Sequence, residues 1–187
     1  MTDTAPTPPS AQDVLRFWFE ESTPSQWFAK DAAFDTAIRA RFGALHRRAT
    51  QAELQGWRAD APGRLAEIIV LDQFSRNLHR GSGEAFAHDG MALALAQEAL
   101  AASADAALPP EQRGFLYLPF MHSESRAIQA ESVALFTRLG NAQSLDFAVR
   151  HRDIVERFGR FPHRNAALGR ATTAEEADFL LQPGSAF

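Results

Sequence analysis

The sequence Arg-Leu-Ala-Glu-Ile-Ile-Val-Leu-Asp-Gln-Phe-Ser-Arg-Asn-Leu occupies residues 64–78 and predicts the central element of the fold. At about 100° per residue, an α-helix places Leu65, Ile68, Asp72 and Arg76 on one stripe. The other apolar residues of this stretch cover much of the remaining circumference, which is typical of a central, buried helix. We therefore expect Asp72 and Arg76 to continue a buried stripe and to pair with each other as an i,i+4 couple.

Helices are predicted for nearly all of the remaining chain. No stretch alternates apolar and polar residues at period two, whereas apolar residues recur at helical spacing from about Asp31 to Ala49. The 187 residues suffice for one domain with a sizeable core. We expect a single all-α domain over residues 11–187, preceded by a flexible tail over residues 1–10 whose composition does not resemble a signal peptide.

Composition excludes several classes of function. The formal net charge of −4 argues against general binding of the protein to nucleic acid or to anionic membranes. The absence of cysteine excludes disulfides, thiol catalysis and thiolate metal sites. No apolar run approaches the roughly 20 residues that cross a bilayer. A cytoplasmic location is the default expectation.

A second helix turns from apolar to polar along its length. Pro110 is expected to open a long helix that ends at Gly140, with Pro119 producing a kink inside it. One stripe of that helix begins with apolar Phe115 and Leu118. It continues with the polar residues His122, Arg126 and Gln129.

A third polar segment, Arg-Phe-Pro-His-Arg-Asn at residues 160–165, echoes Asp-Gln-Phe-Ser-Arg-Asn at residues 72–77. The segment from Arg150 to Arg170 holds six arginines against two acids, a local charge of +4. We expect the three polar segments to converge on one pocket. Its candidate residues are Asp72, Gln73, Arg76, Asn77, His122, Glu124, Arg126, Gln129, Arg160, His163, Arg164 and Asn165.

The same segments carry a resemblance to a known family. The chain resembles the bacterial family of uncharacterised proteins known as DUF924 over about residues 13–181. The stretches that carry the resemblance are residues 17–19 with Trp27 and Phe28, 71–77, 118–124 with Gln129, 157–165 and 168–170. The resemblance implies an all-α fold of stacked antiparallel helix pairs, a tetratricopeptide-like superhelix. No 34-residue repeat is visible in the sequence, so the repeat-like arrangement rests on the resemblance alone. It implies no established activity.

Three functions fit the candidate pocket. The first is a binding module for a small anion or an acidic peptide end, because partly dry arginines pair well with carboxylate or phosphate oxygens. The second is a metal-independent enzyme in which His122 or His163 acts as base or acid, Asp72 orients it, and arginines hold an anionic substrate. The third is an internal polar network that only holds helices in register.

Cofactor and metal chemistry are not expected. The chain has no glycine-rich phosphate loop and no serine in a nucleophile elbow. His122 and Glu124 would lie about 200° apart on a continuous helix, so they would not ligate one metal ion.

Overall fold

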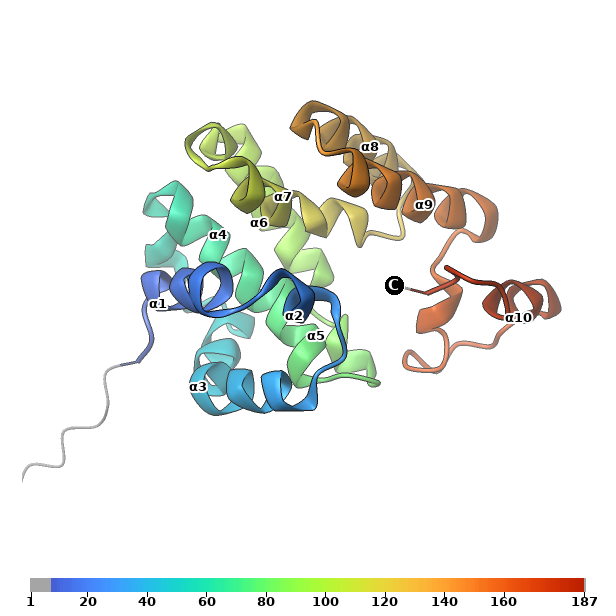
Figure 1. Ribbon diagram of the computed structural model, residues 1–187, viewed down its shortest axis with the longest axis horizontal. Coiled ribbons are helices and arrows are strands. Elements are labelled where there is room, and N and C mark those ends of the chain that lie inside the picture. The colour runs from blue at the N-terminus through green and yellow to red at the C-terminus, as the bar shows by residue number, and fades with distance from the viewer. Residues whose placement is uncertain (1–7, 187) are drawn as a thin grey trace, which may run out of the picture.

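The computed structural model describes residues 8–186, and these residues form helices joined by short turns, without any strand (Figure 1). The α-helices are α1 (Ala11–Arg16), α2 (Pro24–Phe28), α3 (Ala32–Thr50), α4 (Ala61–Ile69), α5 (Ser75–Leu78), α6 (Asp89–Ala101), α7 (Pro110–Met121), α8 (Arg126–Leu139), α9 (Ala142–Phe158) and α10 (Ala174–Leu180). Wide π-helical turns cover Phe17–Glu21 and Val70–Phe74, and 3₁₀ turns cover Gln55–Ala59, Gly83–Ala85, Ala104–Ala107 and Pro162–Arg164. The expected all-α domain is confirmed.

The helical run from α4 through α5 is the central element. Every residue from Leu65 to Ser75 is buried, as the stripe predicted. α4 packs against α1, α6 and α7, so it contacts neighbours on several sides. The wide turn Val70–Phe74 joins α4 to α5 without ending the run, and it carries Asp72. Wide turns of this kind are frequent at functional sites.

An aromatic cluster fills the space between α1, α3 and the central run. Phe17 stacks on Phe34, with ring centres 5.5 Å apart. Trp18 meets Phe74 edge to face at 5.6 Å, and Phe42 lies 5.1 Å from Phe74. Such pairs add about 0.5–1.5 kcal/mol beyond the burial of their surface. Phe17, Trp18, Phe34 and Phe42 therefore belong to the core, whereas Phe28 is 74% exposed.

The prediction of one long helix from Pro110 to Gly140 is wrong, because this stretch forms two helices. α7 ends at Met121, three residues after Leu118, and α8 begins at Arg126. The buried Gln129 side chain donates from Nε2 to the carbonyls of Met121 and Ser123, at 2.8 and 2.6 Å. These bonds satisfy carbonyls that the end of a helix leaves without a partner. His122 and Glu124 consequently lie in a turn.

The C-terminal part of the chain follows its stop signals. α9 ends at Gly159, whose φ of +70° is the left-handed conformation that glycine adopts easily. Thr173 caps α10 in a capping box with Glu176, one of the two registers that the sequence allows. Figure 1 shows α8 and α9 side by side, with α10 set apart from α1 to α5 on the far side of the segment that follows α9.

Three expectations go beyond these observations. The tetratricopeptide-like superhelix stays a prediction. Of the predicted tail, residues 1–7 lie outside the described residues, and Ser10 is already the N-cap of α1. No helix among residues 8–186 combines the length and the apolar character that a membrane span needs, and the cytoplasmic location stays a prediction.

Candidate functional site

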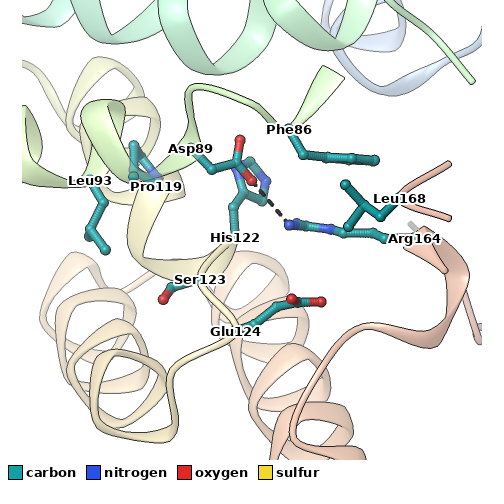
Figure 2. Close-up of a pocket in the computed structure, with 10 residues that line it drawn as sticks. Phe86, Asp89, Leu93, Pro119, His122, Ser123, Glu124, Arg164 and Leu168 are labelled. Atoms are coloured by element: carbon teal, nitrogen blue, oxygen red, sulfur yellow. Dashed lines mark hydrogen bonds and ion pairs between the residues drawn. The ribbon is translucent and has the colours of Figure 1, made fainter. Parts of the chain in front are cut away.

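A pocket of about 240 Å³ opens where α6, the end of α7 and the segment after α9 meet (Figure 2). Its walls carry both apolar and charged side chains, and they come from three parts of the chain far apart in sequence. The lining residues are Phe86, Asp89, Gly90, Leu93, Pro119, His122, Ser123, Glu124, Arg164 and Leu168.

The first polar group of the pocket is the His122 ring. It is hydrogen-bonded to the buried Asp72 carboxylate, which does not itself line the pocket. His122 Nδ1 lies 2.8 Å from Asp72 Oδ1. Asp72 also pairs with Arg76, 2.9 Å away, and accepts a bond from Gln73 Nε2. Burial alone raises the pKa of Asp72, but Arg76 and His122 hold that pKa below its ordinary value, so the group is a carboxylate. It accepts hydrogen bonds only, and His122 Nδ1 therefore carries the proton.

The other ring nitrogen of His122 is left as an acceptor. Burial and the Arg76 guanidinium lower the pKa of His122, so the ring is neutral at pH 7. With the proton on Nδ1, Nε2 keeps its lone pair. Nε2 has no hydrogen-bond partner among residues 8–186, and the His122 side chain lines the pocket. The site thus presents a fixed, neutral proton acceptor.

Asp89, the first residue of α6, joins two arginines that are far apart in sequence. Arg76 donates to both of its oxygens at 3.0 Å, and Arg164 Nη1 donates to Oδ2 at 3.0 Å. Figure 2 shows Arg164 reaching the Asp89 carboxylate from the segment after α9. Two carboxylates, Asp72 and Asp89, therefore balance the charges of two guanidinium groups.

Arg164 is enclosed between two aromatic rings. Its guanidinium carbon lies 4.5 Å from the centre of the Phe86 ring and 4.6 Å from that of Phe161. The side chain is 7% exposed, and burial lowers the pKa of Arg164 to about 10, so it stays charged at pH 7. Its buried Nε has no hydrogen-bond partner among the described residues. A buried cation thus keeps one donor, Nε, without a partner.

Glu124 forms the floor of the pocket in Figure 2. It accepts two bonds from Arg170, at 2.7 and 2.9 Å, and one from the Phe161 backbone N–H at 2.7 Å. Burial raises the pKa of a carboxyl, but these bonds keep the pKa of Glu124 below its ordinary value. Glu124 is therefore a paired carboxylate that fixes the segment carrying Arg164.

Several candidate residues lie away from the pocket lining. Asn77 donates to Asp35, and the exposed Arg126 donates to the Glu156 carbonyl. Gln129 caps the end of α7. Arg160 and Asn165 both bond to Glu176 at the start of α10. His163, half-buried, is outside the lining set, and burial lowers its pKa to about 4.

Sequence reasoning missed Asp89 and Phe86. Asp89 begins an Ala- and Leu-rich helix, and nothing in the sequence marks it as the link between Arg76 and Arg164. Phe86 stands in a turn, and its role as the lid over Arg164 depends on a contact across 78 positions. No local pattern carries such a contact.

Comparison with known proteins identifies a family for this chain. The chain matches the family described as bacterial protein of unknown function, DUF924, over residues 14–184. The chain belongs to the DUF924 family. No curated protein matches it. No three His, Cys, Asp or Glu residues within positions 8–186 are placed to hold a metal ion.

The DUF924 chain is also similar to a solved structure. A protein of unknown function from Agrobacterium tumefaciens shares 44% identity with it at a TM-score of 0.88. The match covers 91% of this chain and 96% of the Agrobacterium chain. The helical arrangement therefore recurs in a second protein of similar length.

Proposed function

We propose that this DUF924 protein binds a small organic anion in the pocket beside Arg164. The observation that carries the proposal is the buried Arg164 guanidinium, whose Nε has no hydrogen-bond partner within residues 8–186. A buried donor without a partner costs about 1–3 kcal/mol, and more when it is charged. A carboxylate bound against this guanidinium would accept charge-assisted bonds from it.

The dimensions of the pocket favour a small ligand. About 240 Å³ is less than the roughly 300–1,000 Å³ of pockets for drug-sized molecules. Leu93, Phe86 and Leu168 supply apolar walls for its carbon skeleton. The neutral Nε2 of His122 adds a preference for a ligand that also carries an O–H or N–H donor. A small hydroxy acid or amino acid has this combination.

The competing explanation is an internal network without a ligand. Asp89 already pairs with both arginines, and the charges of the inner cluster balance. In that case Arg164 would serve only to hold α6 against the segment after α9. The two explanations differ in what happens to stability and to ligand response when Arg164 is removed.

The test compares thermal unfolding of the wild-type protein with that of Arg164→Gln and Arg164→Ala, with and without a panel of small hydroxy acids and amino acids. Arg126→Gln makes the same substitution at an exposed arginine outside the pocket lining. A ligand at 100 times its Kd stabilises the folded protein by about 2.7 kcal/mol. We expect wild type and Arg126→Gln to gain melting temperature with at least one ligand.

Neither Arg164 variant should respond to that ligand. The proposal fails if no ligand shifts the wild-type protein and if Arg164→Ala loses about 3–5 kcal/mol of unfolding free energy, the cost of breaking a buried charge pair. That result would assign Arg164 to a closed structural network.

A further inference from the structure

We propose that the pocket hydrolyses a small anionic carboxylic ester, with His122 as the general base that activates water. This inference rests on the proposed function, because Arg164 is assigned to hold the anionic group of the substrate. It adds a reaction to the binding, and it uses the part of the pocket that binding alone leaves unexplained: a histidine whose position is fixed from behind.

The Asp72–His122 pair has the arrangement that a general base needs. His122 follows the last residue of α7, and its Nδ1–H donates to Asp72 at 2.8 Å. Asp72 is 1% exposed and is itself held by Arg76, so the ring cannot turn away. A bond of this kind fixes both the tautomer and the orientation of the imidazole. Nε2 is then aimed at the pocket with its lone pair available.

Water is the nucleophile that these residues imply. No hydroxyl within residues 8–186 bonds to His122 Nε2, and the chain has no cysteine. Ser123 also lines the pocket, but its Oγ accepts the Ser125 backbone N–H at 3.2 Å. A covalent intermediate on a protein oxygen therefore has no support in this geometry, whereas a water molecule next to Nε2 needs only space.

The proposed reaction consumes one water molecule and needs no other co-reactant. The water oxygen attacks the ester carbonyl carbon while Nε2 takes one of its protons, and the carbonyl π electrons move to the carbonyl oxygen. The tetrahedral intermediate then collapses, the bond to the leaving oxygen breaks, and Nε2–H⁺ returns the proton to that oxygen. An acid and an alcohol leave, and His122 is neutral again.

The surroundings suit this cycle. Asp72 stabilises the imidazolium that forms transiently, as a buried carboxylate does behind a catalytic histidine. The negative charge of the intermediate develops in a pocket that also contains Arg164. The charged and titratable groups around His122 are Asp72 and Arg76 from the central run, Asp89 from α6, Glu124 from the turn after α7, His151 from α9, and His163 and Arg164 from the segment after α9.

The substrate test uses 4-acetoxybenzoate, an acetate ester with a carboxylate, and phenyl acetate, which lacks that carboxylate. Hydrolysis is followed by ultraviolet absorbance at pH 7.5 in the full-length protein. We expect turnover of 4-acetoxybenzoate above the rate in buffer, with a much lower kcat/KM for phenyl acetate. Arg164→Gln should raise KM for 4-acetoxybenzoate by a larger factor than KM for phenyl acetate.

The matched variants are His122→Asn and His79→Asn. Asparagine at position 122 keeps a donor near the place of Nδ1 for Asp72 and removes Nε2. We expect His122→Asn to lose at least about 100-fold in kcat, the usual contribution of a general base. 4-Hydroxybenzoate, the product that keeps the carboxylate, should still raise the melting temperature of His122→Asn as it does that of the wild-type protein. His79 lies beside His46, outside the pocket lining, and its variant should keep full activity.

The outcomes separate the two proposals. If the wild-type protein gains melting temperature with 4-hydroxybenzoate but does not hydrolyse 4-acetoxybenzoate, the hydrolytic proposal is overturned and anion binding stands. If His122→Asn keeps wild-type kcat, His122 is not the base and the proposal is equally overturned. If there is no turnover, if neither 4-hydroxybenzoate nor any ligand of the panel raises the melting temperature, and if Arg164→Ala is destabilised as described above, both proposals fall.

Discussion

Asp72 shows how one buried carboxylate organises its neighbours. It is in contact with Arg76, His122 and Gln73, which come from two segments 50 positions apart. A buried charge without partners is costly, so each of these contacts must be kept for the fold to be stable. The same contacts fix the tautomer of His122. Stability and the chemistry of the pocket therefore depend on the same side chain.

Replacing Asp72 with Asn should destabilise the protein by about 3–5 kcal/mol, because the change removes the buried carboxylate that pairs with the half-buried Arg76. The measurement is urea denaturation at pH 7. Asp146→Asn is the control, since Asp146 is an exposed i,i+4 partner of Arg150 and should contribute only about 0.3–0.5 kcal/mol. An equal loss of unfolding free energy in the two variants would show that burial of the Asp72–Arg76 pair does not increase its contribution to stability.

The break between α7 and α8 places His122 and Glu124 in the turn that joins the two helices. Had the helix continued, the two side chains would point in different directions along its surface. Instead, both line the pocket, and Glu124 fixes Arg170 and the Phe161 backbone. The turn between the two helices is therefore the element that brings a helix end and the segment after α9 to a common site.

Gln129→Leu should cost about 2 kcal/mol of unfolding free energy, because it removes the donor for the Met121 and Ser123 carbonyls. Chemical denaturation measures the loss, and faster amide exchange of residues 122–125 should accompany it. The control is Gln97→Leu on the exposed face of α6, expected within about 0.5 kcal/mol of wild type. An unchanged exchange rate in Gln129→Leu would contradict a capping role.

Buried neutral histidines give the whole protein a defined response to acid. Burial, with the neighbouring His79 and His88, lowers the pKa of His46 to about 4. Burial also lowers the pKa of His151 to about 3 and that of His163 to about 4. An unfolded chain, with its histidines near 6.5, binds more protons in this range than the folded chain does. Protonation therefore favours unfolding.

The unfolding free energy should fall as pH decreases from about 6.5 to about 4. The depressed pKa of His46 alone accounts for up to about 3 kcal/mol, at about 1.4 kcal/mol per pKa unit. Urea denaturation at several pH values measures the slope. His46→Gln keeps a donor for Ser75, which His46 Nε2 contacts at 2.8 Å, and should flatten the slope. The same slope in His46→Gln would place the acid sensitivity on other groups.

Local sequence was enough to predict most of the helices and the buried stripe. Helical periodicity depends on residues three and four positions apart, and caps and prolines act within one turn. Residues 64–78 could therefore be placed in the core from the sequence. The candidates Asp72, Arg76, His122, Glu124 and Arg164 do meet. These results follow from short-range constraints that one sequence contains.

Only the tertiary structure decided how the charges pair. Arg164 and its partner Asp89 are 75 positions apart in the sequence. Asp35 of α3 accepts hydrogen bonds from Asn77 and Arg80, more than 40 positions away. Which acid pairs with which arginine depends on how the helices pack. The local sequence does not distinguish among the several acids and arginines that could pair. The break at residues 122–125 has the same origin, because Gln129 satisfies carbonyls that a continuous helix would have bonded itself. Periodicity placed the polar groups inside, and packing selected their partners.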